Sequence, residues 1–282
     1  MGSANGPIGV FDSGVGGLTV LSAIQRLLPH EPLLYFGDTA RVPYGTRSRQ
    51  DIVQFVQEIV HWMTQEQVRL VVMACNTSSA LALPEVCADF EVPLLGMIEP
   101  AAYAATAGGQ RIGVIATPAT AASHAYRRAI TALNPTAQVW EVGCPAFVPL
   151  IEQNRIHTPE TRATAQTYLA PLLERGIDTL VYGCTHYPLL DPVIKDLLPA
   201  TVRRINPAAQ VAIATAHHLT SDVSPALDLA TAMRPRFCVS GCPEQFAQVA
   251  SQWLGYLPQV EYVVPSLYGV GAERQPSPLP RP

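Results

Sequence analysis

Two cysteines stand at the ends of two apolar runs, each followed at once by polar side chains. Cys75 follows residues 70–74 and precedes Asn-Thr-Ser-Ser, and Cys184 follows residues 178–183 and precedes Thr-His. Apolar runs of this length predict buried parallel strands, whose carboxyl ends are where open α/β sheets place their ligand sites. We therefore expect the chain to be organised around these two thiols.

A pair of thiols facing one ligand from opposite sides can perform a specific chemistry. The thiolate is the reactive form of cysteine, and a position at a helix N-terminus lowers the pKa of a thiol. Both thiols lie at predicted strand-to-helix junctions, and Asp12 and His186 are candidate acid–base partners for them. One sulfur would remove a proton from a carbon while the other returns one to the opposite face. The expected result is inversion at an α-carbon without a cofactor.

A lone cysteine at a strand end is more often a small buried residue than a reactive group. The repeated context of Cys75 and Cys184 favours chemistry for these two, and we keep the structural interpretation for the others, which are Cys87, Cys144, Cys238 and Cys242. Cys238 and Cys242 lack the second pair or histidine cluster of a metal site, so no metal is expected.

Composition excludes several classes of function. The 282 residues are 48% hydrophobic and 14% charged, with a net charge of -4 and no basic stripe, which argues against a nucleic-acid partner. No apolar run reaches the ~18 residues of a membrane span, and the N-terminus lacks a signal pattern, so we expect a cytoplasmic protein. The one lysine, Lys195, lies on a predicted exposed helix face, which argues against a pyridoxal cofactor.

The periodicity of apolar residues predicts alternating strands and helices. The expected strands span 8–11, 33–36, 70–74, 94–97, 111–116, 138–142, 178–183 and 260–263. The expected helices span 18–28, 49–66, the segment from 118 through Tyr126, 159–174, 208–219 and 243–254.

This order, a strand with a polar loop and then helices and strands up to a cysteine, occurs twice. It predicts an α/β fold of two similar doubly wound domains with mostly parallel central sheets and an active site in the cleft between them. The first domain would comprise 1–98 plus 209–272 and the second 99–208, with a Pro-rich disordered tail at 273–282.

Two kinds of polar loop follow the predicted strands. The turn Asp12-Ser13-Gly14-Val15-Gly16-Gly17 lacks the spacing of a nucleotide-binding loop, has no following lysine, and carries a carboxylate that would repel phosphate. Asp38 and Glu152 lie in other strand-end loops, where they fit a functional role or a loop cap equally well.

Four motifs together resemble the glutamate racemase family. They are Ile8-Gly9-Val10-Phe11-Asp12-Ser13-Gly14-Val15-Gly16-Gly17-Leu18-Thr19, Gly37-Asp38-Thr39-Ala40-Arg41 with Pro43-Tyr44-Gly45, Ala74-Cys75-Asn76-Thr77, and Gly183-Cys184-Thr185-His186-Tyr187-Pro188-Leu189. The resemblance covers about residues 8–269. It implies a cofactor-independent enzyme that interconverts L- and D-glutamate, supplies D-glutamate for peptidoglycan, and forms a homodimer.

The resemblance also implies roles for individual residues. Cys75 would exchange the proton of D-glutamate and Cys184 that of L-glutamate, with Asp12 and His186 assisting them and Asp38 and Glu152 as further carboxylates. The residues that match substrate-binding positions are Asp12, Ser13, Pro43, Tyr44, Gly45, Asn76, Thr77, Thr117, Thr120, Thr185 and His186. The chain departs from the family pattern at Cys242 and Asn206, where acidic residues are common, and at Ala119, where Gly is frequent.

Three other functions stay open at this point. A racemase for aspartate could share the two-thiol chemistry, and measuring activity on glutamate and on aspartate would distinguish the two enzymes. A non-catalytic amino-acid-binding or sensor protein would bind glutamate without exchanging its α-hydrogen. A thiol redox protein would form a disulfide on mild oxidation, although neither cysteine lies in a Cys-x-x-Cys motif.

Overall fold

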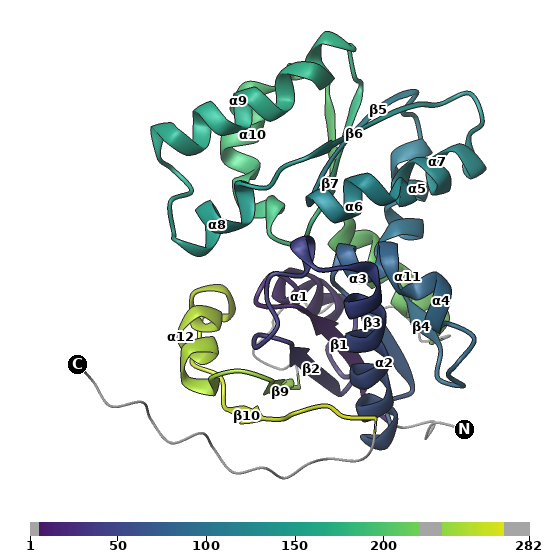
Figure 1. The fold of residues 1–282 in the computed structure, drawn as a ribbon, viewed down its shortest axis with the longest axis vertical. Helices are drawn as coiled ribbons and strands as arrows, with labels where there is room; N and C mark the ends of the chain where they lie inside the picture. Colours follow the sequence, from purple (N-terminus) through teal and green to yellow (C-terminus); the bar gives the residue numbers. More distant parts are fainter. Residues whose placement is uncertain (1–5, 220–232, 268–282) are drawn as a thin grey trace.

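The structure is a computed structural model that describes residues 6–219 and 233–267. The predicted tail at 273–282 lies outside the described residues. Within the described part, the strands form two separate sheets with helices on both sides of each (Figure 1). The predicted α/β fold class, with two doubly wound and mostly parallel sheets, is confirmed, whereas the exact domain boundaries stay a prediction.

The first sheet has six strands and contains the strand that ends before Cys75. In spatial order its strands are β10 (Val260–Tyr262), β9 (Arg236–Val239), β2 (Leu33–Gly37), β1 (Ile8–Asp12), β3 (Leu70–Met73) and β4 (Leu94–Leu95). Every neighbouring pair runs parallel. The two strands nearest the C-terminus therefore return to the edge of a sheet that is otherwise built from the first third of the chain.

The second sheet has four strands and contains the strand that ends before Cys184. In spatial order its strands are β6 (Gln138–Gly143), β5 (Arg111–Ala116), β7 (Thr179–Gly183) and β8 (Arg203–Ile205). These pairs are also parallel. In both sheets the strand that leads to the cysteine lies next to the strand that opens its half of the chain.

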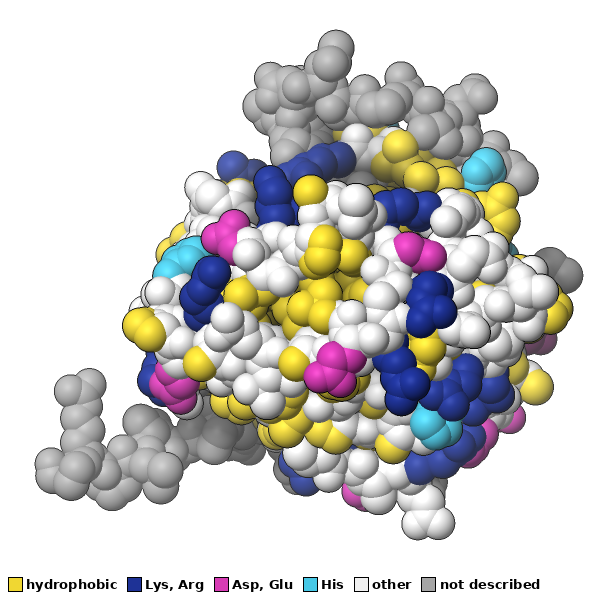
Figure 2. Space-filling model, turned by 90° about the horizontal axis from the view of Figure 1, so that it is seen from above, with side chains coloured by type: hydrophobic (Ala, Val, Ile, Leu, Met, Phe, Trp, Pro, Cys, Tyr) yellow, Lys and Arg dark blue, Asp and Glu magenta, His cyan; other side chains and the backbone are white. Residues whose placement is uncertain are grey.

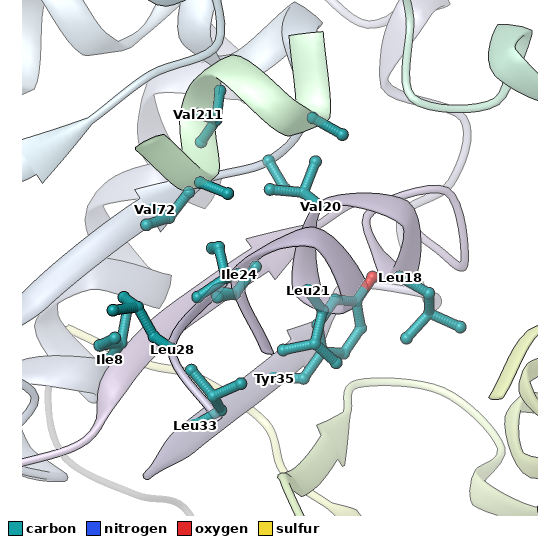
Figure 3. Close-up of a cluster of buried hydrophobic side chains, with 14 of the residues drawn as sticks. Ile8, Leu18, Val20, Leu21, Ile24, Leu28, Leu33, Tyr35, Val72 and Val211 are labelled. Carbon is teal, nitrogen blue, oxygen red and sulfur yellow. The ribbon is translucent and has the colours of Figure 1, made fainter. Parts of the chain in front are cut away.

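Helices cover both faces of the first sheet, because its strands are buried on both sides. Side chains of one face pack against α1 (Leu18–Leu27), α11 (Pro207–His218) and α12 (Pro243–Leu254), as Figure 3 shows for Leu21, Ile24 and Val211. The other face packs against α2 (Arg49–Gln65), α3 (Asn76–Leu81) and α4 (Leu83–Val86). Two hydrophobic cores thus hold the end of β3 in place.

The second sheet is covered in the same way. One face packs against α8 (Phe147–Glu152), α9 (Pro159–Glu174) and α10 (Asp191–Leu197), and the short helix η2 (Tyr187–Leu190) joins this core. The other face packs against α5 (Ile98–Thr106), α6 (Pro118–Ser123) and α7 (Ala125–Leu133). The short helix η1 (Tyr44–Thr46) lies in the loop after β2.

Most predicted elements agree with the observed ones to within one residue at each end, strands β8 and β9 were not predicted, and two predicted elements differ more strongly. The helix expected through Tyr126 is two helices, because His124 between them adopts a left-handed conformation with φ of 54°. The strand expected at 94–97 is only Leu94–Leu95, since Met97 already caps the N-terminus of α5. In the part of the chain that the structure describes, no helix is both long and apolar enough to cross a membrane.

The surface carries charges of both signs. Seen from above, basic and acidic side chains are interspersed among neutral ones, around a group of apolar side chains near the centre of this face (Figure 2).

Candidate active site

Cys75 and Cys184 come from different sheets and line the same cavity. Cys75 follows β3 and Cys184 follows β7, and each is 6% exposed. The cavity has a volume of about 260 Å³ and lies between the two halves of the chain. The other predicted site residues that line it are Ser13, Pro43, Tyr44, Gly45, Asn76, Thr77, Thr117, Glu152, Thr185 and His186. The predicted residues Asp12, Asp38 and Thr120 lie behind this lining.

The thiol of Cys75 is held mainly in its protonated form. Burial is the largest cause that raises its pKa to about 12, and the charge of Asp12 adds to it, against the opposing effect of the backbone N–H groups of Ser78 and Thr77. We expected the helix start to lower the pKa of this thiol. That expectation was wrong for Cys75, because burial and a nearby carboxylate outweigh the backbone donors.

Asp12 ends β1 and is fully buried behind Cys75. Its Oδ2 accepts hydrogen bonds from the backbone N–H of Gly17 at 2.9 Å and of Gly14 at 3.3 Å. Its Oδ1 is buried and has no hydrogen-bond partner among the described residues. A buried carboxylate oxygen without a partner is costly in a folded protein, and it is a ready acceptor for a proton or an ammonium group.

Cys184 lies beside an imidazole instead of a carboxylate. The Sγ of Cys184 is 3.9 Å from Nδ1 of His186, and Nε2 of His186 is 3.0 Å from Oε1 of Glu152. Burial alone would lower the pKa of His186, but its hydrogen bonds to Cys184 and Glu152 raise it to about 10. The hydrogen bond to His186 lowers the pKa of Glu152. At neutral pH this hydrogen-bonded series therefore consists of the Glu152 carboxylate, the His186 imidazolium and the Cys184 sulfur.

Polar side chains from both halves meet at a third corner of the cavity. The hydroxyl of Tyr126 donates a 2.5 Å hydrogen bond to Oδ1 of Asn76, whose Nδ2 is buried without a partner in the described structure. The hydroxyl of Thr77 lies 3.0 Å from that of Thr117 and 3.2 Å from that of Thr120. Thr120 thus supports the lining without being part of it.

Asp38 is also held behind the cavity wall. Its Oδ2 accepts a 2.5 Å hydrogen bond from the Tyr44 hydroxyl, and its Oδ1 accepts one of 2.6 Å from Ser240. The guanidinium of Arg41 lies 3.6 Å from it. Because both oxygens are occupied and the residue is fully buried, this carboxylate is placed to orient Tyr44.

The glycine-rich turn after β1 brings the two halves into close contact. A Cβ at Gly16 would lie 2.4 Å from Oγ1 of Thr185 and 2.6 Å from Nδ1 of His186. A Cβ at Gly17 would lie 2.5 Å from Cβ of Asp12. No side chain fits at either position, so these glycines allow the backbone of the first half to approach the Cys184 corner.

Several lining residues have no signal in the local sequence. They are Val42, Thr46, Pro118, Cys144, Pro145, Val148 and Pro149. Cys144, which we assigned only a packing role, is indeed buried, and burial raises its pKa. Cys144 follows β6, the neighbour of β5, and this position at a strand end was the available sign that it could reach the cavity. Cys87 and Cys242, in contrast, are exposed.

Of the residues that the structure describes, no lysine or arginine lines the cavity, and Glu152 is the one carboxylate in its lining. Among the described residues, no group of three histidine, cysteine or acidic side chains is arranged to hold a metal ion. A ligand with carboxylates would therefore be bound by neutral donors and by the His186 imidazolium.

The chain is similar to known proteins in sequence and in fold. Residues 8–215 match the family model Asp/Glu/Hydantoin racemase. The chain is 58% identical over 257 residues to glutamate racemase of Trichormus variabilis. The matched segment covers 91% of this chain and 87% of that protein.

Two solved structures are similar over nearly their whole length. The crystal structure of glutamate racemase from Bacillus anthracis has a TM-score of 0.86 and 37% identity, and covers 93% of this chain and 98% of that one. The crystal structure of glutamate racemase from Francisella tularensis, in complex with D-glutamate, has a TM-score of 0.82 and 33% identity. The match covers 93% of this chain and 98% of that one.

Proposed function

Because the chain belongs to the Asp/Glu/hydantoin racemase family, we propose that it interconverts L- and D-glutamate by proton transfer between two cysteines. The observation that carries this proposal is the convergence of two buried thiols, from the ends of strands in different sheets, on one cavity. The relatives named glutamate racemase, one of them solved with D-glutamate, support the choice of substrate.

The proposed reaction breaks and forms one bond to hydrogen at the α-carbon. In the L-to-D direction the Cys184 thiolate takes the α-proton, and the electron pair is delocalised into the adjacent carboxylate. The Cys75 thiol then gives its proton to the opposite face, which leaves Cys75 as the thiolate and Cys184 as the thiol. The reverse direction restores the starting state, so protons and electrons balance without a cofactor.

The surroundings of the two sulfurs support this assignment of roles. The imidazolium of His186 is 3.9 Å from Cys184 and stabilises negative charge there, as an adjacent cation does for reactive thiols. The raised pKa of Cys75 keeps its proton available for donation. Asp12 has a free oxygen with which to hold a proton when Cys75 acts as the base.

The lining supports a small amino dicarboxylate as the substrate. The volume of about 260 Å³ is below the ~300–1,000 Å³ of pockets for drug-sized ligands. The amide nitrogen of Asn76 and the hydroxyls of Thr77, Thr117 and Thr185 are suited to carboxylate oxygens. Neutral donors bind such groups without neutralising the charge of the thiolate that takes the proton.

The wider role follows from the same resemblance. We propose that the protein is a cytoplasmic homodimer whose D-glutamate enters peptidoglycan synthesis. Sedimentation equilibrium would test the dimer, and loss of cell-wall synthesis on depletion, restored by added D-glutamate, would test the role. A monomer at all concentrations would contradict the first of these expectations.

The central test is incubation of the purified protein with L-glutamate in D₂O without added cofactor. We expect loss of optical activity by circular dichroism, with one deuterium at the α-carbon by mass spectrometry. Cys75→Ser and Cys184→Ser should each reduce the rate by at least ~10³-fold, at the upper end for a lost acid–base group, whereas Cys238→Ser should not.

Cys238 is a matched control because it is buried at 0% exposure but lies outside the cavity. Glutamate binding without change of rotation or mass would instead indicate a binding protein. Activity on aspartate alone would indicate an aspartate racemase.

A further inference from the structure

A buried tyrosine connects the two cysteine-bearing corners of the cavity. We infer that Tyr126 is a positioning residue of the active site, whose hydroxyl orients the Asn76 amide so that its nitrogen faces a substrate carboxylate. This inference rests on the proposed function. It adds a residue that does not itself line the cavity.

The contacts of Tyr126 reach both corners. It lies on α7 in the second half of the chain and is fully buried. Its hydroxyl donates a 2.5 Å hydrogen bond to Oδ1 of Asn76, the residue that follows Cys75 in the first half. Its ring packs beside Gly183, which precedes Cys184, because a Cβ built there would lie 3.1 Å from Cε2 of Tyr126. One side chain thus contacts the neighbours of both thiols.

The direction of the hydrogen bond determines how Asn76 faces the cavity. A tyrosine hydroxyl whose hydrogen points at Asn76 requires the amide oxygen on that side. The amide nitrogen, Nδ2, is then on the other side, where it is buried and has no partner among the described residues. Asn76 lines the cavity and is 2% exposed. An unpaired buried donor at a cavity wall lacks an acceptor that a carboxylate of the substrate would supply.

Tyrosine is suited to this task in a way that phenylalanine is not. The ring alone would fill the space beside Gly183. The hydroxyl favours the oxygen of Asn76, because among the described residues its hydrogen has no other acceptor and a flipped amide would leave it unpaired. Burial, followed by the nearby charge of Cys184, raises the pKa of Tyr126, so the hydroxyl remains a donor at any working pH. Without that donor the amide can rotate and present its oxygen to the substrate carboxylate, which would repel it.

The test compares Tyr126→Phe, Asn76→Ala and the double variant. We expect Tyr126→Phe to raise KM for both enantiomers by about tenfold, with kcat within about twofold, as for a contact that binds ground and transition states alike. The double variant should be no worse than Asn76→Ala, because Tyr126 acts through Asn76. Independent, multiplying losses in kcat/KM would overturn the inference, as would an unchanged KM in Tyr126→Phe.

Tyr182→Phe is the matched control. Tyr182 is another buried tyrosine of the second half, and its hydroxyl donates a 2.6 Å hydrogen bond to Asp191 away from the cavity. It should lower the Tm like Tyr126→Phe and leave KM unchanged. A similar rise of KM in both variants would mean that Tyr126 has only a structural role.

Asn76→Asp is the second variant, in case Tyr126→Phe does not fold. It keeps the acceptor for Tyr126 and replaces the cavity-facing donor with an oxygen. Binding of D-glutamate, measured by calorimetry, should weaken by at least tenfold, and wild-type affinity would overturn the inference. If the wild type leaves the rotation of glutamate unchanged, the proposed function fails and this inference with it. Racemisation by the wild type combined with either contrary result refutes the inference alone.

Discussion

The corners around Cys75 and Cys184 have the same backbone plan and opposite electrostatics. Each sulfur follows a central parallel strand and is 6% exposed. The pKa of the Cys75 thiol is raised mainly by burial and further by the nearby buried carboxylate of Asp12. Cys184 lies 3.9 Å from an imidazole that Glu152 keeps protonated.

Under the proposed function, this difference would let a repeated fold serve two unequal proton transfers. If both corners carried a carboxylate, both sulfurs would tend to stay protonated and the cavity would lack a base. If both carried an imidazolium, both would favour the thiolate and the cavity would lack an acid. One of each keeps the proton on Cys75 and places a positive charge beside Cys184. Under the proposed function, this arrangement is ready for L-glutamate.

Among changes to the surroundings of the two sulfurs, the largest expected effect comes from removing the charge of either partner. Asp12→Asn and His186→Gln should each lower kcat by about 10²-fold or more. Asp12→Asn should affect D-glutamate as substrate more strongly, and His186→Gln should affect L-glutamate more strongly, as measured by circular dichroism in each direction. Asp178→Asn, a carboxylate that only accepts backbone hydrogen bonds far from the cavity, is the control. Equal losses of kcat with L-glutamate and with D-glutamate would contradict separate roles for the two corners.

The next largest effect should come from disturbing the close contact between the two corners at Gly16. Gly16→Ala places a methyl group 2.4 Å from Oγ1 of Thr185, and relieving such overpacking costs about 1–3 kcal/mol. We expect kcat/KM for glutamate to fall by roughly 10–100-fold, at about 1.4 kcal/mol per factor of ten. Gly14→Ala, in the same turn, meets only Val42 at 3.5 Å and should stay within twofold. Equal effects of both variants would show that the close approach of Gly16 is unimportant.

A smaller effect is expected at Asp38, which supports the Cys75 side through Tyr44. In Asp38→Asn one oxygen remains for two donors, Tyr44 and Ser240, so one buried hydrogen bond is lost. The free energy of unfolding should fall by about 1–3 kcal/mol. KM should rise by a few fold while kcat stays nearly unchanged, and Ser240→Ala should do the same. A loss of kcat as large as that of Asp12→Asn would instead make Asp38 an acid–base group.

The Cys184 corner should also give the stability of the protein a pH dependence. The pKa of His186 is about 10 in the folded protein and ~6.5 in an unfolded chain, so the native state binds more protons between these values. Its contribution to stability is present below about pH 6.5 and is lost as the pH rises through 10. Glu152, with a lowered pKa, contributes above about pH 4.5 and loses this as the pH falls.

Urea unfolding of the wild type and of His186→Gln from pH 5 to 10 measures this effect. The wild-type advantage should shrink as the pH rises, and His217→Gln, at an exposed histidine of α11, should retain the wild-type slope. An advantage that grows with pH would contradict an imidazolium at this corner.

Much of the fold is readable from local pattern. Strand β5 and helices α9 and α12 begin and end at the predicted residues, because continuous apolar runs and caps act over short distances. The break at His124 was not predicted, since a left-handed residue between two helical segments leaves no mark in the periodicity. The cysteines were readable because each follows a strand, and open α/β sheets place their ligand sites at the carboxyl ends of their strands.

The sequence by itself determined which groups exist at the strand ends: the thiols, three carboxylates (Asp12, Asp38 and Glu152), one imidazole and a set of hydroxyls. Only the tertiary structure decided their partners. Glu152 binds His186 across 34 positions, and Ser240 binds Asp38 across 202, which occupies Asp38 behind the wall. Tyr126 reaches Asn76 across 50. Side-chain partners depend on how helices and loops from distant segments pack, which no local pattern encodes, whereas the end of a strand is a local property.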